Sequence, residues 1–169
     1  VLGEPQFDFV TTVDEDGNLS QVQSRKNSSV GYWTYADAVS RDPSGNVTKL
    51  QLGNGLWESG EYNNRSQVTK MGLGTTGATK NLLELDFSYE TTGNHDNNGS
   101  MREQKVVVPT VGSNTGFTAI QSYAYDSLNR IASAEEKVDS TTTWKQTFTI
   151  DRYGNRKFDT SSSGLTTTL

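Results

Sequence analysis

The sequence predicts an all-β protein: a curved antiparallel sheet of consecutive β-hairpins, open or spiralling, with little or no helix. Three observations carry this prediction. Thr, Ser, Asn and Gly make up about two fifths of the 169 residues, and this composition favours turns and strands over long helices. Short turn motifs recur along the chain, and the segments between them alternate apolar and polar residues.

The turn motifs open with Asp or Asn and close with Gly or Asn. An Asp side chain at the turn entry can accept hydrogen bonds from N–H groups two residues on, and Gly or Asn supplies the positive φ of the reversal. The irregular spacing of the motifs fits two strands and two turns, which is a β-hairpin. The expected turn residues are Asp14, Gly17 and Asn18; Asp42, Gly45 and Asn46; Tyr62, Asn63 and Arg65; Tyr125, Asp126, Asn129 and Arg130; and Asp151, Gly154, Asn155 and Arg156. A looser copy runs from Tyr89-Glu90 through Gly93-Asn94 to Asn98-Gly99.

Four segments show the alternation of strands with one apolar face. We expect each to bury that face and to leave the other in water, as antiparallel sheets do. The alternating sets are Phe7, Phe9, Thr11 and Val13; Leu83, Leu85, Phe87 and Tyr89; Phe117, Ala119, Gln121, Tyr123 and Tyr125; and Trp144, Gln146, Phe148 and Ile150. Helical spacing at 127–137 and a candidate helical turn at 36–40 remain as local alternatives.

The motif Tyr125-Asp126-Ser127-Leu128-Asn129-Arg130-Ile131 resembles the tyrosine–aspartate repeat of the YD-repeat (RHS-type) family. The string from Ile150 to Arg156 is similar, with Ile150 where Tyr is usual. Asn54-Gly55-Leu56 leading into Tyr62-Asn63-Asn64-Arg65-Ser66-Gln67-Val68 resembles a degenerate copy. The resemblance covers most of residues 13–160 and is weakest before Tyr32, where Val13 replaces the Tyr. It implies a long sheet of hairpins, which in full-length members winds into a shell that encloses toxins or forms an adhesive barrel.

We therefore expect residues 1–169 to form a single hairpin array with a repeat core at 13–160. Because the chain opens at Val1, we expect a piece of something longer. The resemblance implies an extracellular or cell-surface location and repeats that are not catalytic. A sheet with two open edges also predicts pairing with a further copy or with the rest of a longer repeat protein, into a filament or shell.

Composition argues against several other classes of protein. Fifteen scattered basic residues and a net charge of −5 form no basic stripe for nucleic acid. There is no cysteine for a disulfide, a thiol nucleophile or a cysteine-ligated zinc site. No apolar run reaches the roughly 20 residues of a membrane span. We predict no catalytic, cofactor or metal site, and keep one alternative function: a carbohydrate- or surface-binding adhesion module that uses the aromatic residues Tyr32, Trp33, Tyr35, Trp57 and Trp144.

Several motifs still resemble chemical sites, and each has a simpler interpretation. Asp42-Pro43-Ser44-Gly45 matches the letters of the family's self-cleaving aspartyl motif but continues as a turn. Glu135 with Glu136, or Glu84 with Asp86, has a glycosidase-like pairing but suits a solvated strand face. His95 is the only histidine and lies in a polar loop. Two loops have the residue spacing of a calcium-binding loop but lack its closing Glu. One contains Asp14, Asp16 and Asn18, and the other contains Asn94, Asp96 and Asn98. The run from Gly72 to Gly77 lacks the helix of a dinucleotide site.

Overall fold

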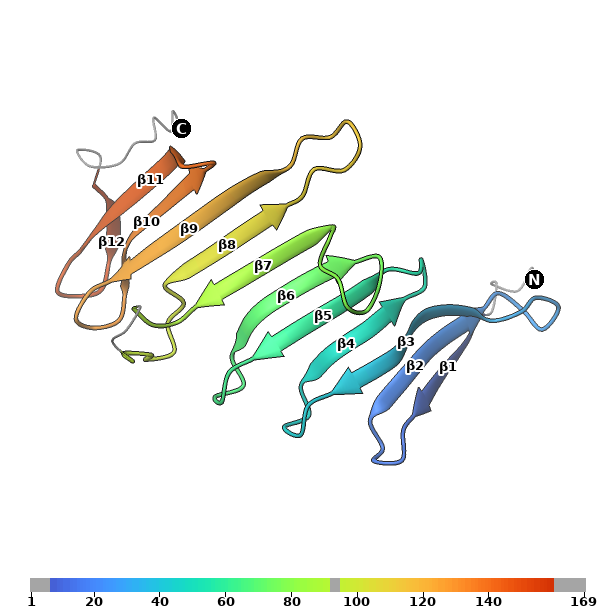
Figure 1. Ribbon diagram of the computed structural model, residues 1–169. Coiled ribbons are helices and arrows are strands. Elements are labelled where there is room, and N and C mark those ends of the chain that lie inside the picture. The colour runs from blue at the N-terminus through green and yellow to red at the C-terminus, as the bar shows by residue number, and fades with distance from the viewer. Residues whose placement is uncertain (1–6, 92–94, 160–169) are drawn as a thin grey trace, which may run out of the picture. The chain divides into compact units, whose positions relative to one another are not determined.

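The computed structural model describes residues 7–91 and 95–159, and every helix or strand assigned there is a β-strand (Figure 1). Each strand pairs antiparallel with its neighbour in the chain wherever a register is assigned. This confirms the predicted all-β fold of consecutive hairpin strands. The chain divides into two compact units, Val1–Leu83 and Glu84–Leu169, and each is described by itself below.

In its described residues the first unit contains six strands, which follow one another in the sheet in chain order. They are β1 (Asp8–Val13), β2 (Leu19–Arg25), β3 (Trp33–Arg41), β4 (Val47–Leu52), β5 (Trp57–Tyr62) and β6 (Val68–Gly74). Because neighbouring strands run in opposite directions, β1, β3 and β5 end at the same edge of this unit. The turns 14–18, 42–46 and 63–67 therefore lie along one edge, which we call the turn edge of the unit.

The second unit repeats this arrangement. Its strands are β7 (Leu83–Ser88), which begins at the last residue of the first unit, β8 (Glu103–Val108), β9 (Phe117–Tyr125), β10 (Ile131–Val138), β11 (Thr141–Ile150) and β12 (Arg156–Phe158). The turns 126–130 and 151–155 follow β9 and β11. The polar segment 95–101 precedes β8, so all three lie at the turn edge of this unit.

Both helical alternatives are wrong. Residues 127–137 contain most of a tight turn and of β10, which is hydrogen-bonded to β9 on one side and β11 on the other. Residues 36–40 belong to β3, where the register to β4 shifts between Asp37 and Ser40 and Ala38 has a φ of 49°. Pairing on both sides of a strand outweighs a local helical spacing.

The expected apolar faces are less buried than the alternation predicted: the face is mostly half-buried in β9 and β11 and exposed in β1. Among the described residues the buried apolar side chains are Ala119 and Ala134, at 6% and 8% exposure, and no large side chain is fully buried. Phe9, expected on an apolar face, is 71% exposed. The physical reason is that the described strands of each unit form one layer, and a sheet buries a face only when a second layer covers it. Interstrand hydrogen bonds and cross-strand pairs therefore carry much of the stability.

Candidate functional site

Six five-residue turns share one backbone pattern. In turn 126–130 the N–H of Asp126 donates to the carbonyl of Arg130 at 2.9 Å, and the N–H of Asn129 donates to the carbonyl of Asp126 at 2.9 Å. The same two bonds, from the first residue to the fifth and from the fourth to the first, recur in turns 14–18, 42–46, 52–56, 63–67 and 151–155. This is the pattern of a hairpin loop with a left-handed residue that forms a bulge.

In five of these turns, the side chain of the first residue accepts two further hydrogen bonds from backbone N–H groups of the turn. One side-chain oxygen of Asp126 accepts hydrogen bonds from the backbone N–H groups of Leu128 and Arg130, both at 2.9 Å. A carboxylate or amide oxygen at the first position makes the equivalent pair of bonds in the other four turns, at Asp14, Asp42, Asn63 and Asp151. The polar first residue thus satisfies two N–H groups that the reversal removes from the strand ladder.

The fourth residue of each turn has a positive φ. Glycine occupies this position in four turns, with φ between 80° and 88° at Gly17, Gly45, Gly55 and Gly154. The other two turns place Ser66 (φ 55°) and Asn129 (φ 61°) there. Asn tolerates the left-handed region better than most residues, whereas Ser carries the strain of that conformation.

Three of the turn carboxylates have pKa values lowered by their hydrogen bonds. The Asn46 side-chain amide, 2.9 Å from Asp42, lowers the pKa of that carboxyl most. The pKa of Asp126 is lowered first by the backbone N–H of Arg130 and then by its guanidinium, whose Nε lies 2.7 Å from the second carboxylate oxygen. The Asn155 amide acts in the same way on the pKa of Asp151, at 2.8 Å. The hydrogen bonds of the turns therefore stabilise the ionised form of these carboxylates.

The degenerate copy in the sequence includes Asn54-Gly55-Leu56, but the turn 52–56 was not among the expected turns. Its first residue is Leu52, which has no side-chain acceptor, and Asn54 instead accepts a hydrogen bond from the N–H of Leu56 at 3.0 Å. It joins β4 to β5 at the edge opposite the turn edge. The pair Asn54-Gly55 is a strong hairpin signal, and it could have identified the turn without the tyrosine–aspartate motif.

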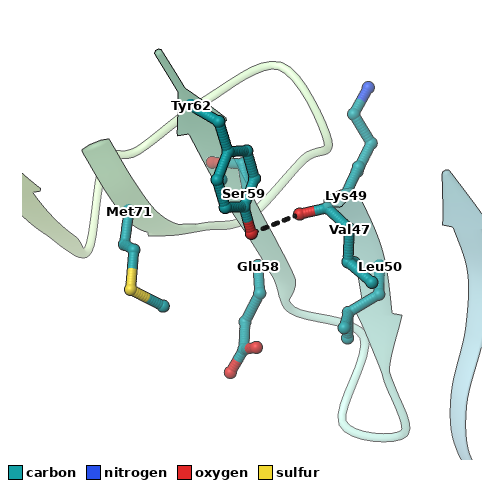
Figure 2. A pocket seen from close by; sticks show the side chains of 8 residues that line it. Val47, Lys49, Leu50, Glu58, Ser59, Tyr62 and Met71 are labelled. Carbon is teal, nitrogen blue, oxygen red and sulfur yellow. Dashed lines mark hydrogen bonds between the residues drawn. The ribbon is translucent and has the colours of Figure 1, made fainter. Parts of the chain in front are cut away.

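A second feature recurs at several of the strands that end at the turn edge, and it joins the last residue of the strand to the residue that follows the preceding turn. The hydroxyl of Tyr62, the last residue of β5, donates to the backbone carbonyl of Val47 at 3.0 Å, and Val47 is the first residue after turn 42–46 (Figure 2). The hydroxyl of Tyr125, the last residue of β9, donates to the carbonyl of Met101 at 2.6 Å. We call these strand-end hydrogen bonds.

Arginine takes the tyrosine's place at the end of β3. One guanidinium nitrogen of Arg41 lies 3.5 Å from the carbonyl of Leu19, the first residue after turn 14–18, and the other donates to the carbonyl of Gly45 at 3.0 Å. Arg41 and Tyr62 therefore hold the same position relative to successive turns. Burial raises the pKa of Tyr125, so its hydroxyl retains the proton that it donates.

Gly60 makes room for the tyrosine ring. A Cβ atom at Gly60 would lie 3.0 Å from the Val47 carbonyl oxygen and 3.1 Å from the Tyr62 hydroxyl. The ring, Met71 and Leu50 help to line an open hollow of about 160 Å³ on the sheet (Figure 2). The Tyr62–Val47 hydrogen bond lies beside this hollow. Its lining residues include no pair of carboxylates that could act as an acid and a base, so the hollow has the features of a packing contact between strands.

The remaining predicted turn residues lie in or beside the turns but make no strand-end hydrogen bond. Arg65 donates its backbone N–H to the Asn63 side chain at 2.9 Å. Arg156 begins β12, and its guanidinium lies over the Phe148 ring, 4.5 Å from the centroid. Ile150 and Val13, which end β11 and β1, hold the position of Tyr62 but carry no donor. This repeating contact is therefore missing at these two strand ends.

Side chains also connect adjacent turns along the edge of each unit. In the first unit the Asn46 amide lies 3.4 Å from the Ser66 hydroxyl of the next turn. In the second unit, Asn98 and Ser100 both donate to the Asn129 side chain, at 3.0 and 2.8 Å. Gly99, with a φ of 97°, precedes Ser100 as Gly45 precedes Asn46. The segment beginning at Asp96 thus holds the place of a turn in this series.

The carboxylates that resembled catalytic groups are engaged in structural bonds. Both oxygens of Asp42 bind the atoms of its own turn. Lys137, at 3.0 Å, is the main cause of the lowered pKa of Glu135, while hydrogen bonds from Gln121 and then Thr143 lower that of Glu136. A glycosidase acid needs a raised pKa, so these groups are poorly suited to protonate a leaving group.

The other candidate motifs also lie in structural settings. Asp86 lies 3.8 Å from Lys105, and Glu84 is on the same face of β7. The His95 side chain is 90% exposed, 3.8 Å from Glu90. The described residues contain no group of three or more His, Asp or Glu that could hold a metal ion, although Asn94 lies outside them.

The glycine run at the end of β6 allows the chain to fold back closely. A Cβ atom at Gly74 would lie 2.0 Å from the backbone oxygen of Thr79. The returning segment is held by the N–H of Leu82, which donates to the Leu73 carbonyl at 3.0 Å. Close approach of two backbones therefore explains this glycine without a phosphate ligand.

The aromatic candidates differ in exposure. Trp33 is 62% exposed, and Phe9 and Trp33 flank Ser24 on one face because both pair with it in register. Ser24 is 3% exposed and donates to the Tyr35 hydroxyl at 3.0 Å. Tyr32 receives the Arg25 guanidinium on its ring at 4.6 Å. Trp57 and Trp144 are half-buried. Exposed rings therefore gather on β1 and β3 of the first unit.

Comparison with known proteins identifies the fold. No family model matches the sequence, and no curated protein matches it. The fold is similar to a chain in the structure of the Photorhabdus luminescens Tc holotoxin pore carrying the TccC3-D651A mutation, with a TM-score of 0.53 and 12% identity over 92% of this chain. It is also similar to a chain in the crystal structure of TcdB2-TccC3 without the hypervariable C-terminal region, with a TM-score of 0.54 and 10% identity over 93% of this chain.

These similarities confirm the resemblance to the RHS-type family at the level of the fold. The present chain spans 9% of the length of each of these two toxin chains. Separately, the described residues include no helix that is long and apolar enough to cross a membrane.

Proposed function

We propose that the chain is a non-catalytic scaffold segment of an extracellular or cell-surface repeat protein, and that its sheet edges pair into a filament or shell. The turn edge of each unit carries this proposal. Its polar side chains hydrogen-bond to the backbone of their own turns, form the strand-end hydrogen bonds and connect adjacent turns, and all three kinds of contact position strands. In the first unit, Asp14, Arg41 and Asp42 help to line an open hollow of about 500 Å³ beside turns 14–18 and 42–46. Their side chains are already engaged in hydrogen bonds within the turns, which supports a structural role for this edge.

The fold of the toxin-complex chains supports the same function. Hairpin repeats bury little surface alone and gain stability from neighbouring repeats, so a short array favours addition of further strands at its edges. The scarcity of buried apolar side chains in each unit agrees with this dependence on neighbours.

Assembly and location can be tested separately. Sedimentation velocity and electron microscopy of the purified chain should reveal oligomers whose size grows with concentration. A single monomeric boundary at all concentrations would contradict self-association. Protease treatment of intact source cells should cleave the chain, because a surface location leaves it accessible. Protection until the cells are lysed would contradict the location and leave the assembly result unaffected.

One observation favours adhesion to carbohydrate as a second function. The exposed rings of Trp33 and Phe9 share a sheet face, and flat aromatic rings stack well on apolar sugar faces. A glycan array should then give binding that Trp33→Ala abolishes and Trp57→Ala retains, because Trp57 is half-buried against Gly77. An array without hits would exclude this function.

A further inference from the structure

The two ends of the series of strands carry open edges. Among the described residues β1 is hydrogen-bonded only to β2, and β12 only to β11. The outward-facing N–H and C=O groups of such strands are a template for another strand. What would fit this template is set by the register that the hairpins themselves follow.

Three of the four neighbouring hairpin pairs with an assigned register share one alignment, counted from the turns. In the fourth, Val22 of β2 pairs with Ala36 of β3, one residue away from that alignment. Lys49 is seven residues beyond the start of turn 42–46, and it pairs with Ser59, four residues before the start of turn 63–67. Ser133 stands in the same relation to turn 126–130 and pairs with Thr147, four residues before turn 151–155.

The third pair is Glu103 with Ser122, which lies four residues before turn 126–130. Glu103 is seven residues beyond Asp96, which begins the segment at the turn edge that takes the position of a turn before β8. The register is therefore the same although the lengths of chain between the turns differ.

The same rule can be applied to β12 and β1. Turn 151–155 precedes β12, and turn 14–18 follows β1, so an antiparallel pair of these strands would keep both turns on one edge. The rule then aligns Phe158 with Val10 and Lys157 with Thr11. These two strands are the only described ones with a free edge, and they fit one another in the register that three of the four hairpin pairs follow.

We propose that β12 of one copy of this chain pairs antiparallel with β1 of a second copy, with Lys157 opposite Thr11 and Phe158 opposite Val10. This inference rests on the self-association in the proposed function and specifies its partner and register. Because the two paired surfaces differ, the contact is head-to-tail, and its repetition generates a filament or, if the rotation closes, a ring.

The chemistry of the two edges is complementary. The β12 edge carries Arg152, Arg156 and Lys157, whereas turn 14–18 beside β1 carries Glu15 and Asp16. Arg152 and Glu15 occupy the same second position of their turns, so the proposed register brings opposite charges to neighbouring turns. Phe158, 59% exposed, and Val10, 37% exposed, would form an apolar cross-strand pair.

Engineered cysteines test the register, because the chain has none of its own. The double variant Lys157→Cys with Thr11→Cys, oxidised with glutathione disulfide, should give a ladder of covalent multimers in a denaturing gel without reductant. Directly opposed residues in an antiparallel pair have Cα atoms about 4.5–5.5 Å apart, within the range that a disulfide spans. Both residues are exposed, so the substitutions spare the folded chain.

The matched control is Lys157→Cys with Val10→Cys, which places the two thiols on opposite faces of the pair. Phe158→Cys with Val10→Cys is a second in-register pair, and it should also form multimers. Equal crosslinking in the control and the in-register pairs would overturn the proposed register, and so would a disulfide closed within single chains.

The failure of this inference differs from the failure of the proposed function. If the unmodified chain sediments as oligomers but the in-register pairs crosslink no better than the control, then self-association stands and the β12–β1 register is wrong. If the chain sediments only as a monomer, the proposed self-association is wrong as well.

Discussion

Replacing Tyr62 by Phe removes one hydroxyl and leaves the aromatic ring in place. The lost strand-end hydrogen bond joins the Tyr62 hydroxyl to the Val47 carbonyl across 3.0 Å. A typical intramolecular hydrogen bond stabilises a protein by about 0.5–1.5 kcal/mol. Because the hollow beside the bond is open, water can reach the freed carbonyl, so the larger penalty for a buried unsatisfied acceptor does not apply.

We therefore expect Tyr62→Phe to lower the free energy of unfolding by about 1 kcal/mol, or roughly fivefold in the unfolding equilibrium constant. The loss should be local, because the units of a repeat array open separately. Native-state hydrogen exchange should show faster exchange of the amides of β4 and β5, with no change in β1. Tyr125→Phe should act in the same way on β8 and β9.

The control is Tyr32→Phe, since the described structure gives the Tyr32 hydroxyl no hydrogen bond and its ring would still receive Arg25. This variant should leave exchange rates within experimental error of those of the unmodified chain. If Tyr62→Phe and Tyr32→Phe behave alike, the strand-end hydrogen bond contributes nothing, and the structural role assigned to this tyrosine is refuted.

Three further predictions concern the turns of the second unit. The pKa values of Asp126 and Asp151 are lowered in the folded state, so their contribution to stability is complete above the unfolded Asp pKa of about 3.9 and is lost as the pH falls through the folded values. The free energy of unfolding in urea should therefore fall as the pH is lowered from about 5 to 2, and Asp126→Asn should make this dependence on pH weaker. Ile150→Tyr supplies the missing donor at the end of β11. If its hydroxyl reaches the carbonyl of Ile131, the free energy of unfolding should rise by about 0.5–1.5 kcal/mol. An unchanged denaturation midpoint would show that the position is not equivalent to Tyr62. Gly154→Ala forces a Cβ into a φ of 88° where the surrounding space is open, so thermal unfolding should shift down by backbone strain alone, about 1 kcal/mol, whereas Gly154→Asn should retain most of the stability.

The strands and the tight turns were accessible from the sequence because their signals are local. The alternation through Phe117 and Tyr125 predicted β9, and the entry Asp126 with Asn129 lies within five residues of chain. The same local logic explains why the turn 52–56 was left out of the expected turn residues. Leu52 carries no acceptor at the first position, and the side chain that supports the turn is two residues later, at Asn54.

The strand-end hydrogen bonds were not predictable from the motifs. The acceptor of Tyr125 is the carbonyl of Met101, and a backbone carbonyl carries no side-chain signal in the sequence. The burial of the apolar faces was mispredicted for a related reason. Alternation shows which residues share a face, but only a second layer decides whether that face is covered, and Phe9 therefore remains exposed.

Counting the register from the turns at one edge has a consequence for how such a chain tolerates changes in length. The connections at the other edge already vary, with four residues between β4 and β5, eight between β8 and β9, and two between β10 and β11. We expect peptides inserted into these connections to leave the flanking strand pairs aligned, which makes them positions for grafting an epitope or a binding sequence. A single residue added within a strand would instead have to be taken up by a bulge, as beside Val13 and Tyr62, or it would exchange the two faces of that strand.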